Sequence, residues 1–295
     1  MNRREASDIL TAVPLDELSD RCSTIRSSGF GDKVDLCAIV NAKKGACSED
    51  CAFCAQSRTV GEPMLDLGKL VETHRTITDA GIHRFSLVTS GKGLAGDEFK
   101  RICEAASSGV DFCPLCASLG ILGLDELKEL KDAGVIRYHH NLETSEYFFP
   151  SICTTHTWNE RRITVHRVKL AGMSACSGGI MGIGESDSDR IDLALSLREL
   201  DVESIALNFY MPVEGARVNA EYLSPEKLLR IIAMFRLVNP TAELRICAGR
   251  TELEMMGEKM FSFGVTGIMT GTLLTTEGSQ LEHDLDLIER AGFRT

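Results

Sequence analysis

The chain has 295 residues, enough for two ordinary domains or for one large α/β barrel. Its hydrophobic fraction of 43% predicts a globular core, and its net charge of −11 argues against a nucleic-acid-binding or anionic-membrane-binding surface. The first residues lack the apolar run of a signal peptide and no stretch reaches the length of a membrane span, so we expect a cytoplasmic protein. In that compartment, eleven cysteines indicate metal ligands, redox groups or buried thiols rather than disulfides.

We assign residues 1–30 to an N-terminal helical segment, and after them a short β-rich run followed by a longer helical pattern recurs along the chain. The expected strands, in chain order, are 34–40, 84–89, 111–118, 135–141, 173–178, 204–209, 243–248 and 266–271. The expected helices that follow them are 67–81, 97–109, 124–134, 158–172, 188–200, 224–238, 251–264 and 281–292. Several of these helices end in glycine, which favours the left-handed conformation at a helix C-terminus.

Eight strands that alternate with eight helices predict a parallel sheet, and eight repeats allow that sheet to close into a (β/α)8 barrel over residues 31–295. A doubly wound open sheet is the structural alternative. In a barrel of this kind the chemistry lies at the carboxyl ends of the strands.

Three cysteines, Cys47, Cys51 and Cys54, stand close together in "GACSEDCAFCAQS", directly after the first expected strand. Structural zinc sites normally use four protein ligands, and disulfide frameworks use an even number of cysteines. Three thiolates on one loop instead suit a four-iron cluster in which one iron has no protein ligand. The alternatives are three incidental buried thiols or a partial zinc site.

The spacing, with Phe53 before the last cysteine, resembles the CxxxCxΦC signature of radical S-adenosylmethionine enzymes, whose open iron binds the cofactor. Six further segments resemble blocks of the biotin synthase family in the same order: "YHHNLETS", "TTHTWNERR", "CSGGIMGIGES", "ALNFYMPVEGAR", "LRICAGR" and "LLTTEG". The resemblance covers about residues 30 to 293. It implies a radical barrel enzyme that inserts sulfur into dethiobiotin, using a 4Fe-4S cluster with S-adenosylmethionine and an auxiliary iron–sulfur cluster as sulfur source.

The resemblance assigns several residues to the S-adenosylmethionine site. Phe53 would lie near the adenine, Glu143 would contact the ribose and Arg161 would hold the carboxylate, a task suited to a planar, charged guanidinium. The family more often has Asp at position 143, and Glu keeps the carboxylate with a longer reach. Because "NERR" contains two adjacent arginines, a solvated helix charge remains the alternative for Arg161. Gly179 and Gly182, in "SGGIMGIGE", would let the backbone approach the cofactor.

For dethiobiotin, the resemblance implies contacts from Asn141, which would also touch the cofactor, and from Asn208, which would bind the ureido ring. Asn208 could instead cap the loop that follows its strand. Together with Arg245, these two residues are the expected catalytic groups.

The auxiliary cluster of the family is a 2Fe-2S cluster held by cysteines on the second, third and fifth strands and by an arginine on the seventh. Here Cys116, Cys176 and Arg245 match three of those ligands, but Ser86 stands at the second-strand position. A hydroxyl is a poor substitute for a soft thiolate on iron, so the usual two-iron site is not expected.

Two additional cysteines, Cys37 and Cys247, fall on the first and seventh strands, and side-chain alternation should point Cys247 inward together with Arg245. Alternate strands of a barrel contribute one layer of side chains. We therefore expect Cys37, Cys116, Cys176 and Cys247 to share one inward layer and to hold an auxiliary four-iron cluster.

Buried core packing is the alternative for these four thiols. Cys113 should point away from Cys116 and becomes a substitute ligand only where the strand bulges. The remaining cysteines are expected to be structural: Cys22, Cys103 and Cys153.

A hydrogenase-maturation-like or other cofactor-forming radical enzyme is the alternative function, and a non-enzymatic iron–sulfur carrier is the alternative class. The resemblance also implies a flavodoxin or ferredoxin as electron donor, and it leaves a homodimer open.

Overall fold

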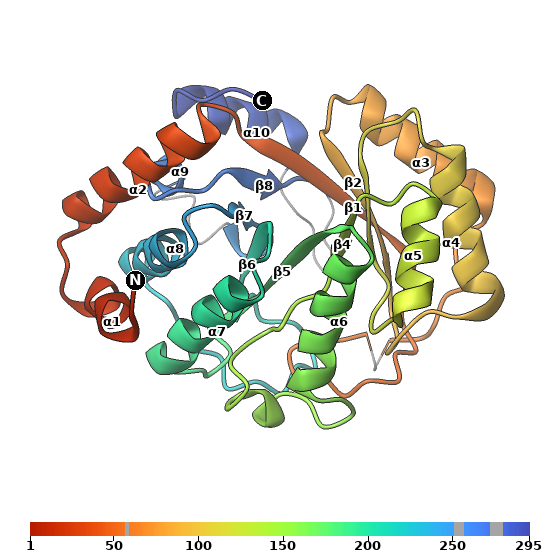
Figure 1. Ribbon diagram of the computed structural model, residues 1–295, viewed down its shortest axis with the longest axis horizontal. Helices are drawn as coiled ribbons and strands as arrows, with labels where there is room; N and C mark the ends of the chain where they lie inside the picture. The colour runs from red at the N-terminus through yellow and green to blue at the C-terminus, as the bar shows by residue number, and fades with distance from the viewer. Residues whose placement is uncertain (57–58, 251–256, 272–279) are drawn as a thin grey trace.

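Eight parallel strands, hydrogen-bonded in chain order, close into a barrel in the computed structural model, which describes residues 1–56, 59–250, 257–271 and 280–295 (Figure 1). The strands are β1 Asp35–Lys43, β2 Arg84–Thr89, β3 Leu115–Ser118, β4 Arg137–His139, β5 Ser174–Met181, β6 Ser204–Phe209, β7 Glu243–Ile246 and β8 Gly267–Met269. The helices that alternate with them are α3 Leu67–Asp79, α4 Gly96–Ser108, α5 Leu124–Asp132, α6 Trp158–Leu170, α7 Asp187–Glu199, α8 Pro225–Val238, α9 Lys259–Ser262 and α10 Leu281–Arg290. The predicted (β/α)8 barrel is thus confirmed, and the open-sheet alternative is wrong.

The predicted strand positions are largely confirmed, and their ends differ. β2 and β6 cover the predicted residues, whereas β3 begins at Leu115 instead of residue 111. Pro114 explains this difference in part, because it has no N–H to donate to a neighbouring strand. Of the predicted helix 251–264, residues 251–256 lie outside the described part of the chain, and α9 covers Lys259–Ser262.

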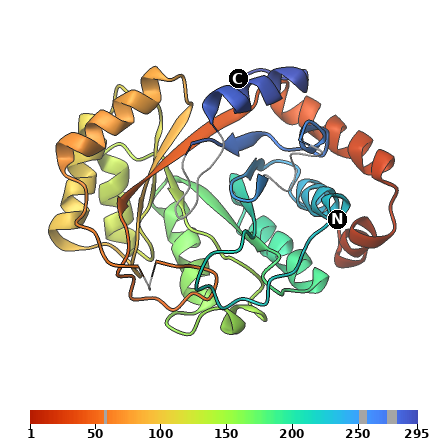
Figure 2. The ribbon, with the colours of Figure 1, turned by 180° about the vertical axis from the view of Figure 1, so that it is seen from behind.

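Two additional helices, α1 Arg3–Thr11 and α2 Leu15–Phe30, precede the barrel and pack against α8 (Figures 1 and 2). Arg26 anchors α2, because its buried guanidinium donates to the carbonyl oxygens of Val265 and Lys33 at 2.9 and 3.0 Å. The division of the chain at residue 30 stays a prediction. Among the described residues, no helix combines the length and the apolar character needed to cross a membrane.

The start of α6 is determined by a capping box. The Thr157 side chain accepts from the backbone N–H of Glu160, and the Glu160 carboxylate accepts from the backbone N–H of Thr157 at 2.7 Å. Such reciprocal bonds satisfy N–H groups that have no partner inside the helix. The capping box therefore places Arg161 at the beginning of α6, beside the carboxyl ends of the strands.

The two faces of each strand differ in character. Phe85 and Leu87 of β2 are buried in the hydrophobic core, whereas Arg84, Ser86 and Val88 line a cavity inside the barrel. Barrel interiors are usually filled by bulky branched side chains. Here polar and thiol side chains face inward, and the interior holds a site instead of a packed core.

Candidate active site

A cavity of about 370 Å³ lies within the barrel and reaches the loops at the carboxyl ends of the strands. Every cysteine that the sequence analysis assigned to a cluster lines it: Cys37, Cys47, Cys51, Cys54, Cys116, Cys176 and Cys247. So do most of the other predicted site residues: Phe53, Asn141, Glu143, Arg161, Asn208 and Arg245. Gly179 and Gly182 are described residues that are not part of the lining.

The three-cysteine loop is tightly folded. The backbone N–H of Cys54 donates to the carbonyl oxygen of Cys51 at 3.1 Å, and that of Cys47 donates to the carbonyl of Gln56 at 3.2 Å. The backbone N–H of Gln56 in turn donates to the Cys54 sulfur at 3.4 Å. All eleven cysteines of the chain lie in the described part and none forms a disulfide; those at 47, 51 and 54 are partly exposed.

These thiols suit an iron–sulfur cluster by their chemistry, because thiolate is the ligand that such clusters use. Burial raises the pKa of the Cys51 thiol far above its ordinary value, and the positive charge of a bound metal ion would oppose that shift. Close to the loop, Asn141 Oδ1 is buried and has no hydrogen-bond partner within the described residues. An unpartnered polar atom in a cavity wall indicates a position for a polar ligand.

Asn141, Glu143 and Arg161 form one hydrogen-bonded group. Asn141 Nδ2 donates to Glu143 Oε2 at 3.2 Å, and Arg161 Nη1 lies 2.9 Å from the carbonyl oxygen of Asn141 and 3.4 Å from Glu143 Oε1. Burial raises the pKa of Glu143, although the Arg161 charge acts against that shift. Arg161 therefore faces the cavity and is not the solvated helix charge of the alternative interpretation.

Glu143 has a backbone φ of +71°, a conformation that non-glycine residues rarely adopt. It also pairs with Gly179 of β5 through a parallel bridge. A Cβ at Gly179 would lie 2.2 Å from the carbonyl oxygen of Glu143, so only glycine allows this approach. Gly182 has a φ of +92°, and its N–H donates to Glu185 at 2.9 Å. These glycines shape the backbone, and their direct contact with a cofactor stays a prediction.

Asn208, on β6, is held by the backbone of its neighbours. Its Nδ2 donates to the carbonyl oxygen of Gly179 at 3.3 Å, and its Oδ1 accepts from the N–H of Ala248 at 3.3 Å. The side chain thereby links β5 to the segment after β7 while it lines the cavity. Asn208 therefore lies where a substrate contact is expected, and it also binds the backbone near its strand, as the alternative interpretation proposed.

The four strand cysteines are all buried, but they do not share one layer. The register pairs shift by about one residue per strand around the barrel, as in barrels of shear 8. This shift places the following residues at one height: Cys37, Cys116, Cys176 and Arg245. Cys247 is two residues further along, nearer the cavity mouth, where it packs with Cys176 and Ala206. The prediction that Cys247 belongs to the same layer is therefore wrong, since Arg245 takes that place.

Charged side chains surround the strand thiols on the side away from the mouth. Arg137 Nη1 lies 2.6 Å from Glu243 Oε2, and Arg84 Nε lies 2.7 Å from Asp35 Oδ2. Arg245 Nη2 is buried and makes no hydrogen bond to a described residue, but it lies 3.5 Å from Asp35 Oδ2 and 3.6 Å from Glu243 Oε2. Three guanidinium groups and two carboxylates therefore lie below the strand thiols, which leaves an excess of positive charge there.

The pKa values of the four strand thiols differ in this environment. Burial raises the pKa of Cys37 to about 11, and it raises the pKa of Cys116 and Cys247 further. Burial would also raise the pKa of Cys176, but His139, whose Nδ1 lies 3.3 Å from its sulfur, together with Arg137, lowers that pKa to about 7. Cys176 is therefore the thiol of this group that ionises most easily.

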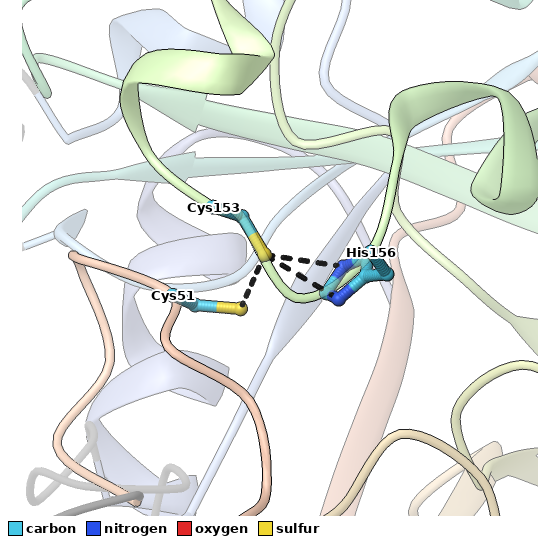
Figure 3. A group of neighbouring side chains, drawn as sticks. All are labelled: Cys51, Cys153 and His156. Carbon is cyan, nitrogen blue, oxygen red and sulfur yellow. Dashed lines mark hydrogen bonds between the residues drawn. The ribbon is translucent and has the colours of Figure 1, made fainter.

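Cys153, predicted from the sequence to be structural, lies beside the three-cysteine loop. Its sulfur is 3.8 Å from that of Cys51 and 3.4 Å from His156 Nδ1, and Figure 3 shows the three side chains converging from two segments. Their donor atoms lie close enough to hold a metal ion. However, both ring nitrogens of His156 have other partners, Glu49 Oε2 at 2.5 Å and Arg161 Nε at 2.9 Å. We therefore interpret this trio as hydrogen-bonded side chains.

Sequence reasoning missed the residues that support the site: Glu49, Arg84, Arg137, His139 and His156. His156 stands in "TTHTWNERR" and Glu49 lies between two cluster cysteines, but neither segment shows that the two meet. Cys113 lies before β3, where its backbone contacts Thr78 and His74 of α3, and it is not part of the cavity lining.

The three-cysteine loop on a (β/α)8 barrel defines a class of protein, and a family model of that class matches: "Radical SAM superfamily", over residues 44–197. The enzymes of this class carry a 4Fe-4S cluster with S-adenosylmethionine. A second family model, "Biotin and Thiamin Synthesis associated domain", matches residues 206–294.

The relatives narrow the class further. The biotin synthase of Clostridium perfringens (strain 13 / Type A) is 46% identical over 95% of this chain and 90% of its own length. That of Clostridium botulinum (strain Loch Maree / Type A3) is 41% identical over 97% of this chain and 95% of its own length. The chain belongs to the biotin synthase family, and it is a radical enzyme of the sulfurtransferase class. The FeFe-hydrogenase maturase HydG from Carboxydothermus hydrogenoformans has a TM-score of 0.85, with 16% identity over 99% of this chain and 75% of its own, which shows a shared fold alone.

Proposed function

We propose that this protein converts dethiobiotin to biotin, with S-adenosylmethionine as the source of the radical and an auxiliary iron–sulfur cluster as the source of sulfur. The observation that carries the proposal is that one cavity collects both cysteine groups and the polar residues between them. In a member of the biotin synthase family, that cavity would hold two clusters, a cofactor and a substrate.

Cys47, Cys51 and Cys54 would hold the 4Fe-4S cluster, which supplies a 5′-deoxyadenosyl radical when S-adenosylmethionine is bound. Arg161 and Glu143 would orient the cofactor through its carboxylate and ribose, with Phe53 near the adenine and Gly179 and Gly182 shaping the adjacent backbone. The buried Asn141 Oδ1, unpartnered within the described residues, supports a ligand contact at this side of the cavity.

Asn141 and Asn208 would bind dethiobiotin between the mouth and the strand thiols. Sulfur insertion replaces two C–H bonds of the substrate by C–S bonds, so the substrate must lie between the radical source and the sulfur source. The order of residues along the cavity supports this, because the three-cysteine loop lies at the carboxyl ends of the strands and Cys116 and Cys176 lie deeper in the barrel.

For the auxiliary site we propose a four-iron cluster held by Cys37, Cys116, Cys176 and Cys247, which would supply the sulfur. Three thiols at one height and a fourth nearer the mouth suit the corners of a cubane better than four thiols in one plane. Arg245, in the layer of the three thiols, would face the cluster as a charge-balancing group. The positive charges of Arg84, Arg137 and Arg245, which Asp35 and Glu243 offset only in part, support an anionic occupant.

The test is anaerobic incubation of the reconstituted protein with S-adenosylmethionine, reductant and dethiobiotin. We expect 5′-deoxyadenosine together with biotin. A different cofactor-forming radical enzyme would cleave S-adenosylmethionine without forming biotin, and an electron carrier would form neither product. We further propose a flavodoxin or ferredoxin as the electron donor, a cytoplasmic location and a homodimeric state, which reduction assays, cell fractionation and sedimentation would test.

A further inference from the structure

A chain of buried hydrogen bonds connects the three-cysteine loop to Arg161. Glu49, between Cys47 and Cys51, has its Oε2 at 2.5 Å from His156 Nδ1, and the Nε2 of the same ring is 2.9 Å from Arg161 Nε. The Glu49 and His156 residues are 8% and 6% exposed, so little water competes for these bonds. Residues far apart in the sequence are thereby joined beside the cavity.

Only one assignment of donors and acceptors is consistent with the hydrogen bonds among Glu49, His156 and Arg161. A guanidinium carries only donors, so Arg161 must donate and His156 Nε2 must accept. The proton of the neutral ring then lies on Nδ1, which donates to the Glu49 carboxylate. Burial and the nearby Arg161 charge lower the pKa of His156, in agreement with a neutral ring.

Both ends of the chain are held in place. The Glu49 carboxylate accepts from Thr155 Oγ1 at 2.7 Å and from Ser48 Oγ at 2.9 Å. Arg161 is held through Nε and Nη1, and its guanidinium lies 5.7 Å from the centre of the Phe149 ring. Within the described residues, Arg161 Nη2 donates to no protein acceptor, which leaves it for a ligand in the cavity.

We propose that Glu49 and His156 are positioning residues that orient Arg161 from the loop that bears the cluster ligands, so that cofactor binding depends on the fold of that loop. This inference rests on the proposed function, in which the loop carries the cluster and Arg161 holds the cofactor carboxylate. Neither residue has to touch the substrate or the cofactor.

The test compares His156→Leu with His156→Gln in the reconstituted holoprotein. Leu removes both hydrogen bonds, whereas the amide of Gln can accept from Arg161 and donate to Glu49. The measurements are iron content, the dissociation constant of S-adenosylmethionine from the change it causes in the electron paramagnetic resonance spectrum of the reduced cluster, and 5′-deoxyadenosine formation. We expect full iron content in both variants and about tenfold or greater weakening of cofactor binding in His156→Leu, largely restored in His156→Gln.

Two further variants test whether His156 affects cofactor binding through Arg161. If His156 acts through Arg161, the double variant His156→Leu, Arg161→Ala should bind the cofactor no more weakly than Arg161→Ala alone. Arg162, exposed and bound to Asn159, offers the control Arg162→Leu, which should behave like wild type.

Three outcomes would overturn the inference: wild-type cofactor affinity in His156→Leu, equal weakening by Leu and Gln, or additive effects in the double variant. A loss of iron in His156→Leu would also count against it, with Glu49→Gln, which can still accept from His156, as the milder second test. Failure of the proposed function would look different, because Arg161→Ala itself would then leave cofactor binding unchanged.

Discussion

The two cysteine groups of this barrel depend on different levels of structure. Cys47, Cys51 and Cys54 lie within one loop, partly exposed, and local backbone bonds bring them together. The strand thiols are buried and come from four strands whose register decides their heights in the barrel. These strand thiols are Cys37, Cys116, Cys176 and Cys247. The spacing along the sequence is enough to bring the loop cysteines together, whereas the strand cysteines are brought together only when the barrel closes.

The two cysteine groups should therefore tolerate different substitutions. The loop group needs its three thiols and the turn that presents them. The strand group is adjusted by its neighbours His139 and Arg137, which lower the pKa of Cys176 against the effect of burial. The two groups should therefore respond separately to substitution.

The largest expected effect is on the loop group. Replacing Cys47, Cys51 or Cys54 by Ala should abolish 5′-deoxyadenosine formation and, with it, biotin formation, because two thiolates hold a four-iron cluster poorly. Chromatographic assay of both products after anaerobic reconstitution measures this. Cys103→Ala, a half-buried thiol on α4, is the matched control and should keep both activities. Wild-type 5′-deoxyadenosine in any one of the loop variants would contradict the assignment.

The next largest effect distinguishes the strand cysteines from the loop cysteines by the product that is lost. Cys116→Ala and Cys176→Ala should abolish biotin formation but leave 5′-deoxyadenosine formation, because they remove the sulfur source and spare the radical source. The same two product assays apply, in the presence of dethiobiotin. Ser86→Cys, added to either variant, should not restore biotin, since a cluster that uses a thiol on β2 would have a different shape. Loss of both products would mean that the groups are not independent.

The iron count sharpens the comparison. With four thiols at the auxiliary site, the anaerobic protein should hold about eight irons per chain, instead of about six for a four-iron and a two-iron cluster. Cys37→Ser and Cys247→Ser should each lower iron and sulfide content, because oxygen is a harder ligand than thiolate. Mössbauer spectra would identify the cluster that is lost. A protein lacking both Cys37 and Cys247 that kept all its iron and turnover would show these two thiols to be core packing.

The smallest expected effects concern the polar residues between the groups. Asn208→Ala should weaken dethiobiotin binding and Arg161→Ala should weaken S-adenosylmethionine binding, each by about 1–3 kcal/mol. Separate binding titrations of the two ligands measure this. Because Asn208 also links Gly179 to Ala248, a thermal unfolding midpoint must accompany its titration. Equal effects of both variants on both ligands would contradict the division of roles.

Much of this molecule follows from its sequence. Eight repeats of strand and helix predicted the closed barrel, because each apolar strand and amphipathic helix must bury its face against the next unit. The ends of β3 and β4 were less predictable, since they depend on neighbours that pair with them. The cysteine spacing at 47, 51 and 54 predicted the loop group because its geometry is local.

Other features were decided only by the tertiary structure. Sequence alternation placed Cys247 and Arg245 on the inward face, but the stagger between strands decided that Arg245 shares a layer with Cys176 and that Cys247 lies nearer the mouth. The contacts among Glu49, His156 and Arg161 were likewise invisible, because no local pattern records which loops meet at the mouth of a closed barrel. A strand's period fixes the face on which a side chain lies, whereas its height and its partners depend on the register of the whole barrel.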